Sequence, residues 1–475
     1  MESNKINKLK CLLTELDSCG IDYVSWKNNH QLQSVMLGEG DIDLFVPLGD
    51  RSEFIRICRD HDWIELQNPV SKQSWITHFY GLGANLEIFH IHVYFKIITG
   101  ESWLKEYTFP FDNWMIKNRV RNKYHDIWIL NSPSQAYLFL LRHMLKCGSF
   151  SSRLLYKREL VSYREEWESF SSGIKPEDIE GPINIKPYLS HSGVFESKLK
   201  LPNIILAFLF RLSFLPFLRR KFLSLFLFRI LSFLRRLINK VFLNQKKILP
   251  EHGLTIAISG VDGSGKTSML NEVDKLLGQF ITTKKFHLGR PQGKFIEFIW
   301  RALGNKSNNS SMPGCYDIDT PSSIGRAING AILALLRLRK ARQVCNEAKH
   351  GGIMLIDRWP TDELGKMDGP RVILGENSGV LLRLCKNIES WAYTCMPHVD
   401  ICYFFEVPIE VASQRNQSRV KENKETDEQI YARFLGNIDF KPLARKTIRF
   451  ENSGDFLIKR KEFIENIWKE INNRY

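Results

Sequence analysis

The chain has 475 residues, of which 43% are apolar and 25% charged, so its composition predicts about two to four folded domains and excludes wholesale disorder. None of its nine cysteines forms a C-x-x-C pair, which argues against a zinc site and against a secreted disulfide framework. Ten of its fifteen net positive charges lie within residues 201–250, so the charge belongs to one stretch and does not indicate a general nucleic-acid-binding protein.

The N-terminal segment, residues 1–135, predicts an α+β domain. Residues 6–20 have apolar side chains at helical spacing, which predicts an amphipathic helix. The N-terminal segment is charged throughout and has no apolar core of a signal peptide, so we expect a reducing, cytoplasmic setting. A short strand over residues 21–26 and a turn at Gly38 and Gly40 lead to a second strand over residues 41–46.

Three acidic residues in this segment are candidate metal ligands. Side chains alternate along a strand, so Asp41 and Asp43 share one face about 7 Å apart, where two carboxylates can share a divalent cation. A third predicted strand, over residues 85–93, carries Glu87, which is the candidate for the third carboxylate.

This pattern resembles the nucleotidyltransferase fold, in which a glycine turn precedes D-x-D on one strand and a third acid lies on a neighbouring strand. The resemblance implies that Asp41, Asp43 and Glu87 hold two Mg²⁺ ions around a nucleoside triphosphate. Glu39 in the turn and Glu87 differ from the usual residues of the family, so an inactive domain is the alternative. Nucleic-acid end processing would need more basic residues near Asp41 than Lys27 and Lys72.

Residues 136–200 predict a helical extension of this domain, followed by a linker. A helix is expected over residues 133–165, with Pro133 in its first turn, and His143 within it is expected to be structural. Residues 166–200 contain several glycines and prolines, which suits a linker or a loosely packed connection.

Residues 201–250 predict a basic amphipathic helical segment. The longest charge-free run, residues 201–210, is about half the ~20 residues that a membrane-spanning helix needs. After Pro216, Arg229, Arg236 and Lys240 fall close to one side of a helix. The pattern indicates either a helix lying on an anionic membrane surface or a helix packed between domains with solvated arginines.

Residues 251–475 begin with the clearest motif of the chain. GVDGSGKT, residues 260–267, fits G-x-x-x-x-G-K-[ST] between an apolar strand and a predicted helix. Glycines let backbone N–H groups surround a phosphate, Lys266 can reach the β- and γ-phosphates, and the Thr267 hydroxyl can ligate Mg²⁺. The expected nucleotide-binding residues are Gly260, Gly263, Ser264, Gly265, Lys266, Thr267 and Ser268.

Alternating strands and helices after this loop predict a parallel, doubly wound sheet. Strands are expected at residues 284–288, 352–356 and 400–407, and helices over residues 324–349 and 408–419. Asp357 and Arg358 directly follow a buried strand, where a P-loop fold places its Mg²⁺-organising carboxylate.

The combination of GVDGSGKT, the D-R-W at 357–359 and the stretch from 397 to 419 resembles the thymidylate kinase family of nucleoside monophosphate kinases. The resemblance covers most of residues 251–475. It implies ATP and Mg²⁺ as cofactors and catalysis by positioning and charge neutralisation.

By position, the resemblance assigns a role to each matching residue. Asp262 matches an acid near the acceptor sugar, Arg290 and Arg358 match residues that bind the acceptor phosphate, and Arg415 and Arg419 fall in the lid over the phosphates. The expected catalytic residues are Lys266, Asp262, Asp357, Arg358, Arg415 and Arg419, and the expected metal ligands are Thr267 and Asp357.

The segments that would recognise thymidylate differ from the family. The loop at 289–294 reads GRPQGK and lacks the glutamate of R-E-P-G-G-T, and the residues after Trp359 do not continue as a base-contacting A-Y-Q segment. Phosphate handling is therefore preserved where acceptor recognition is not, and the acceptor need not be thymidylate.

Together these patterns predict an ATP- and Mg²⁺-dependent phosphotransferase fused to a nucleotidyltransferase-like domain, suited to nucleotide or surface-glycan metabolism at the inner membrane face. The expected partners are a small-molecule phosphate acceptor and an anionic membrane surface; nucleic acid is not expected, and a homodimer is left open. The alternative is a nucleotide-binding regulator or membrane-surface scaffold with an inactive N-terminal domain.

Overall fold

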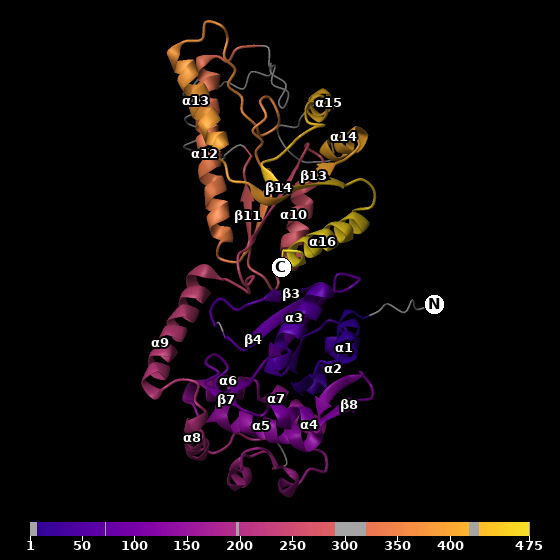
Figure 1. Ribbon diagram of the computed structural model, residues 1–475, viewed down its shortest axis with the longest axis vertical. Coiled ribbons are helices and arrows are strands. Elements are labelled where there is room, and N and C mark those ends of the chain that lie inside the picture. Colours follow the sequence, from indigo (N-terminus) through magenta and orange to yellow (C-terminus); the bar gives the residue numbers. More distant parts are fainter. Residues whose placement is uncertain (1–6, 72, 196–198, 290–319, 418–426, 475) are drawn as a thin grey trace, which may run out of the picture. The chain divides into compact units, whose positions relative to one another are not determined.

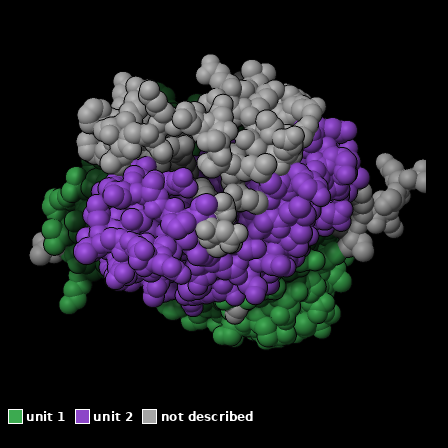
Figure 2. Space-filling model, turned by 90° about the horizontal axis from the view of Figure 1, so that it is seen from above, with its two compact units in different colours: residues 1–245, 468–475 green, residues 246–467 purple. Residues whose placement is uncertain are grey.

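The computed structural model describes residues 7–71, 73–195, 199–289, 320–417 and 427–474 (Figure 1). The chain divides into two compact units, coloured separately in Figure 2: unit 1 comprises residues 1–245 and 468–475, and unit 2 comprises residues 246–467. The predicted segments 1–135 and 136–200 and most of 201–250 therefore belong to one unit. The end of the chain joins unit 1 because Trp468 Nε1 donates to the Asp62 carbonyl at 2.9 Å and Asn472 Nδ2 to the Arg59 carbonyl at 2.7 Å.

Unit 1 is built on a mixed seven-stranded sheet in the order β3-β4-β5-β2-β1-β9-β8. The β2–β5 and β1–β9 pairs are parallel, and the other neighbours are antiparallel. The strands of this sheet are β1 (Val24–Lys27), β2 (Asp41–Phe45), β3 (Trp63–Leu66), β4 (Ile76–Leu82), β5 (Ile88–Tyr94), β8 (Arg119–Asn122) and β9 (Ile127–Leu130). Two further strands, β6 (Ile97–Thr99) and β7 (Tyr107–Phe109), pair with each other.

The helices of unit 1 pack on both faces of the sheet. The α-helices are α1 (Lys8–Ser18), α2 (Leu32–Met36), α3 (Arg51–Asp60), α4 (Asp112–Lys117), α5 (Ser132–Cys147), α6 (Phe150–Arg158), α7 (Leu160–Ser171), α8 (Ile204–Ser213) and α9 (Phe222–Ile238). Ile42 and Leu44 of β2 pack into a core with α1 and α3, whereas Phe45 packs into a second core with α5. This division confirms the predicted alternation, which places Asp41 and Asp43 on the face toward α5.

The helical extension differs from the prediction in two respects. The single helix expected over residues 133–165 is three helices: α5 ends at Cys147 and is followed by Gly148, where a Cβ would lie 2.3 Å from the Ala207 carbonyl of α8. The expected linker is packed: Ile179, Ile185 and Leu189 are buried in the same core as α5. Only Ile185 and Leu189 are a helical spacing apart, and one such pair is too short a periodic signal to mark the segment as core.

Two arginines of the basic segment, Arg211 and Arg229, turn toward the protein, whereas Arg220 and Arg235 are exposed, as expected for solvated arginines. Arg211 of α8 is buried and ion-paired with Glu106, and its Nη1 donates to the Leu145 carbonyl at 2.7 Å. Arg229 of α9 bonds the buried carboxylate of Glu101 at 2.5 Å. After α9 the chain makes a π-helical turn, Asn239–Leu243. Among the described residues, no helix is both long enough and apolar enough to cross a membrane.

Unit 2 is a five-stranded, all-parallel sheet in the order β11-β12-β10-β13-β14, which confirms the predicted parallel α/β architecture. Its strands are β10 (Leu254–Gly260), β11 (Thr283–His287), β12 (Ile353–Asp357), β13 (Val399–Glu406) and β14 (Ala444–Glu451). Its helices are α10 (Lys266–Leu277), α12 (Ile324–Ala348), α13 (Val380–Thr394), α14 (Ile409–Gln417), α15 (Asp427–Gly436) and the first part of α16 (Phe456–Asn472), whose residues from Trp468 on belong to unit 1. Cys402 of β13 packs toward α12 and α13, and the adjacent Tyr403 packs on Phe463 of α16, so helices cover both faces.

Candidate functional sites

The glycine-rich loop of unit 2 connects the central strand β10 to helix α10. Its glycines are required at two positions where the backbone has positive φ and close neighbours. A Cβ on Gly263, with φ of +87°, would lie 2.4 Å from the Ala412 carbonyl, and one on Gly265, with φ of +86°, would lie 2.6 Å from Asn452 Nδ2. The loop therefore wraps the N-terminus of α10, where free N–H groups and the helix dipole favour an anion.

The side chains of the loop differ in exposure. Lys266 is buried, and its Nζ donates to the Val261 carbonyl at 2.6 Å, which holds the ammonium inside the loop. Thr267 and Ser268 are exposed in the first turn of α10. Asn452, which directly follows β14, fastens the loop by donating from Nδ2 to the Ser264 carbonyl at 2.7 Å.

Asp357, at the carboxyl end of β12, offers an oxygen for a cation. Thr267 Oγ1 lies 3.4 Å from its Oδ2, and His287 Nδ1 lies 3.3 Å from the same oxygen. Within the described residues, no hydrogen-bond donor reaches the buried Oδ1. Burial opposes ionisation, but the bond from His287 and the charges of Lys266 and Arg358 outweigh it and lower the pKa of Asp357. An ionised carboxylate and a hydroxyl are the hard oxygen donors that Mg²⁺ prefers, so these residues fit that ion.

Arg358 is held in an arginine–aspartate network. Its backbone has a φ of +69°, and its guanidinium bonds Asp262 of the loop at 2.5 Å and Asp368 at 3.5 Å. Asp368 is in turn bonded by the buried Arg337 at 2.5 Å, and Arg433 of α15 lies 3.5 Å from Asp262. Asp262 therefore lies beside two guanidinium groups in this structure.

The two predicted lid arginines have different outcomes. Arg415 of α14 lies beside the loop, where its Nη1 donates to the Asn452 carbonyl at 3.0 Å. Arg419 and the predicted acceptor-binding Arg290 both lie outside the described residues.

Sequence reasoning missed His287, Asn452, Asp368, Arg337 and Arg433. His287 ends β11 and Asn452 follows β14, so both were recognisable as residues at the carboxyl edge of a parallel sheet, where ligands bind. Arg337 lies inside α12 and Asp368 in the loop after β12, and their pairing depends on a fold that brings distant residues together. No local pattern marks them.

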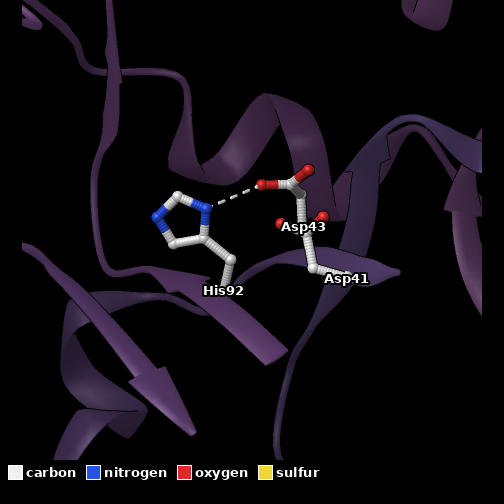
Figure 3. Close-up of side chains that lie close together, drawn as sticks. All are labelled: Asp41, Asp43 and His92. Atoms are coloured by element: carbon white, nitrogen blue, oxygen red, sulfur yellow. Dashed lines mark ion pairs between the residues drawn. The ribbon is translucent and has the colours of Figure 1, made fainter. Parts of the chain in front are cut away.

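Unit 1 contains a second candidate site, shown in Figure 3. Asp41 and Asp43 of β2 and His92 of β5 each offer a ligand atom within 4.8 Å of the others. The parallel pairing of β2 with β5 places Asp43 opposite His92, and His92 Nδ1 lies 3.1 Å from Asp43 Oδ1. Two carboxylates and an imidazole are a donor set that binds divalent metals.

Glu87, the predicted third acid, is absent from this group. It precedes β5 in a turn, where its carboxylate accepts from the Asn85 backbone N–H and from Asn85 Nδ2, both at 2.8 Å. The strand starts one residue later than Glu87, and His92 supplies the third ligand type instead.

Asp43 already has cationic and polar partners from the protein. The ammonium of Lys27 lies 2.8 Å from Oδ1, and Asn28 Nδ2 donates to Oδ2 at 3.0 Å. Burial alone would raise the pKa of Asp43, but Lys27 and His92 hold it well below its usual range. A metal ion at Asp43 must therefore compete with Lys27, so the fit is weaker here than at Asp357.

A basic pocket of about 590 Å³ adjoins this cluster. His92, Lys105, Arg51 and Arg236 are among the residues that line it. Lys105 Nζ donates to Tyr94 Oη at 3.0 Å; burial and the nearby charge of Lys27 lower the pKa of Lys105 to about 7. The pocket meets the cluster at His92, and its cations, which outnumber the acidic Glu65, suit an anionic ligand.

His143 was expected to be structural, and its contacts agree. It is buried, with Nδ1 2.7 Å from Tyr156 Oη and Nε2 3.0 Å from the Ser192 carbonyl. Burial lowers its pKa to about 4.

Comparison with known proteins connects the chain to thymidylate kinases over about half its length. A thymidylate kinase from Thermosipho africanus (strain TCF52B) is 25% identical over 221 residues, which are 46% of this chain and 94% of that protein. A solved structure of thymidylate kinase from Candida albicans covers 47% of this chain and 94% of its own, with 13% identity and a TM-score of 0.30. No protein-family model matches the chain.

Proposed function

We propose that unit 2 is an ATP- and Mg²⁺-dependent phosphotransferase of the thymidylate-kinase-like class. The observation that carries this proposal is the arrangement around Asp357: no donor within the described residues reaches its buried Oδ1, and its Oδ2 lies 3.4 Å from the P-loop hydroxyl of Thr267. The similarity to thymidylate kinase over 221 residues supports the reaction class.

Each residue has a role that follows from its position. The loop N–H groups and Lys266 bind and orient the phosphates of ATP, and Thr267 and Asp357 hold Mg²⁺, which offsets phosphate charge when bound. Arg358, positioned by Asp262 and Asp368, binds the phosphate of the acceptor. Arg415, beside the loop, offsets the charge that develops during transfer.

We further propose that the acceptor is a phosphorylated or hydroxyl-bearing small molecule other than thymidylate. The residues after Trp359 differ from the base-contacting segment of thymidylate kinases, and Asp262 is engaged by Arg358. A sugar, nucleotide or surface-glycan building block suits a kinase fused to the fold proposed for unit 1.

The test is ATP consumption by the purified full chain with Mg²⁺ and a panel of nucleoside monophosphates, nucleosides, sugars and sugar phosphates. Transfer to one class and its loss in Lys266→Ala are expected. Binding of ATP without transfer to any acceptor would overturn the kinase assignment and favour a nucleotide-binding regulator.

For unit 1 we propose a nucleotidyltransferase-like domain that binds a nucleoside triphosphate in the basic pocket beside Asp41 and Asp43. The pairing of Lys27 with Asp43 favours a second candidate, a domain that binds nucleotide without catalysis. Asp41→Ala distinguishes them: a transferase loses turnover, whereas a binding domain loses partner binding or localisation only. Lys266→Ala, measured separately, assigns any turnover to one unit.

A further inference from the structure

Helix α9 of unit 1 has its apolar side facing solvent. Phe226, Ile230, Phe233, Leu234 and Leu237 are between 44% and 59% exposed. The opposite side faces the protein, where Ser232 is buried, Arg229 bonds Glu101, and the Arg236 guanidinium lies over the ring of Trp103. The orientation is the reverse of an ordinary surface helix, whose polar side meets water.

The exposed apolar surface continues onto helix α8. Ile205 and Phe208 of α8 are 66% and 51% exposed. An apolar groove of about 580 Å³ lies between the two helices. It is lined by side chains of both, including Phe208, Leu212, Leu225 and Phe226. A continuous exposed surface of this kind marks an interaction site.

Basic residues border this surface and acidic residues are absent from its sequence. Arg220 and Lys221 precede α9, Arg235 lies at the edge of its apolar side, and Lys240 follows it; all four are exposed. No Asp or Glu occurs in residues 201–250. The surface therefore combines an apolar face with a cationic border.

We propose that α8 and α9 dock unit 1 on a bilayer that contains acidic phospholipid. The apolar face of α9 enters the boundary between headgroups and acyl chains, an acyl chain occupies the groove, and the basic residues meet the phosphates. With 17 residues, α9 is about 25 Å long and lies in the plane of the membrane. A second copy of the chain would bring the same cationic border against itself, so charge complementarity favours the lipid surface.

The test is co-sedimentation of the full chain with phosphatidylcholine vesicles that contain about 30% phosphatidylglycerol, against phosphatidylcholine alone. Ile230→Glu/Leu234→Glu places two carboxylates on the outward face. Val380→Glu/Leu457→Glu is the matched control, because these residues are also exposed and apolar but lie in unit 2. Arg235→Glu/Lys240→Glu tests the charged border. Far-ultraviolet circular dichroism verifies that each variant is folded.

We expect the partition onto acidic vesicles to fall by at least about tenfold in Ile230→Glu/Leu234→Glu and to be unchanged in the control. The charge variant should lose the preference for phosphatidylglycerol, and the wild type should lose it at high salt. No sedimentation with acidic vesicles, or unchanged sedimentation of Ile230→Glu/Leu234→Glu, would overturn the proposal. So would a dimer that becomes monomeric in that variant without any vesicle binding, since the surface would then pair two copies.

Discussion

The two acidic sites of this chain differ in how closely the protein's own cations approach the carboxylates. In unit 1, Asp43 is paired with the ammonium of Lys27 and bonded by Asn28, so its charge is balanced from within the protein. In unit 2, no donor within the described residues reaches the buried Oδ1 of Asp357, its Oδ2 lies near a hydroxyl and an imidazole, and Lys266 and Arg358 act on it through their charges. An acidic motif alone therefore does not identify a metal site, since an ammonium in direct contact with the carboxylate, as Lys27 is with Asp43, competes with a metal ion.

The largest effect is expected from Lys27→Met, because it leaves Asp43 buried and ionised without its cation. The free energy of unfolding should fall by about 3–5 kcal/mol, measured by urea denaturation. The double variant Lys27→Met/Asp43→Asn removes both charges and should recover most of this loss. If Lys27→Met lowers the free energy of unfolding by less than about 1 kcal/mol, Lys27 is not the main electrostatic partner of Asp43.

A similar effect, on activity, is expected from Lys266→Ala. This variant removes the ammonium that the loop holds for the phosphates of ATP. The phosphotransfer rate should therefore fall by about 10²–10³-fold. Lys275→Ala, at the exposed end of the same helix, should behave as wild type. Equal losses in both variants would mean that α10 as a whole, rather than Lys266, had been disturbed.

Asp357→Asn tests the proposed metal site directly. Removing the charge but keeping the shape should weaken the apparent Mg²⁺ affinity of the ATP reaction by at least about 10- to 100-fold, measured by Mg²⁺ titration. The exposed Asp362→Asn is the control. Asp43→Asn should leave this titration unchanged, and a shift there would contradict the contrast between the two sites.

The smallest effect is expected on stability in acid. The buried His143 should make the stability of unit 1 depend on pH, in addition to the charged pair at Asp43. The pKa of His143 is about 4 in the folded protein and 6.5 ordinarily, so the unfolded chain takes up the proton first. The contribution of neutral His143 to the free energy of unfolding is complete above pH 6.5 and is lost as the pH falls toward 4. The loss amounts to about 2 kcal/mol by pH 5. Urea unfolding against pH should show a shallower slope for His143→Phe, while a variant of the half-exposed His125 should keep the wild-type slope.

The patterns that were predictable from the sequence are local ones. The P-loop is contiguous, and the alternation along β2 fixes the shared face of Asp41 and Asp43 without knowledge of any partner. The order of the parallel strands in unit 2 brings Asp357 beside Thr267, as expected for residues at the carboxyl ends of parallel strands.

The patterns that were not predictable depend on register and on distant partners. The sequence predicts a strand over residues 85–93, but only the pairing with β2 shows that His92, and not Glu87, lies opposite Asp43. Helical spacing divides α9 into two sides but cannot say which side faces inward. The buried Glu101 determines which side of α9 faces the protein, because its carboxylate pairs with the guanidinium of Arg229.

The return of residues 468–475 to unit 1 has a consequence for how the protein is made. Asp62 and Arg59 receive donors from Trp468 and Asn472, which leave the ribosome more than four hundred residues later. Unit 1 therefore remains incomplete throughout synthesis of unit 2. Dissection of the chain at residue 245 would separate α3 and β3 from these donors, so an isolated first unit should be joined to the end of α16 by a linker.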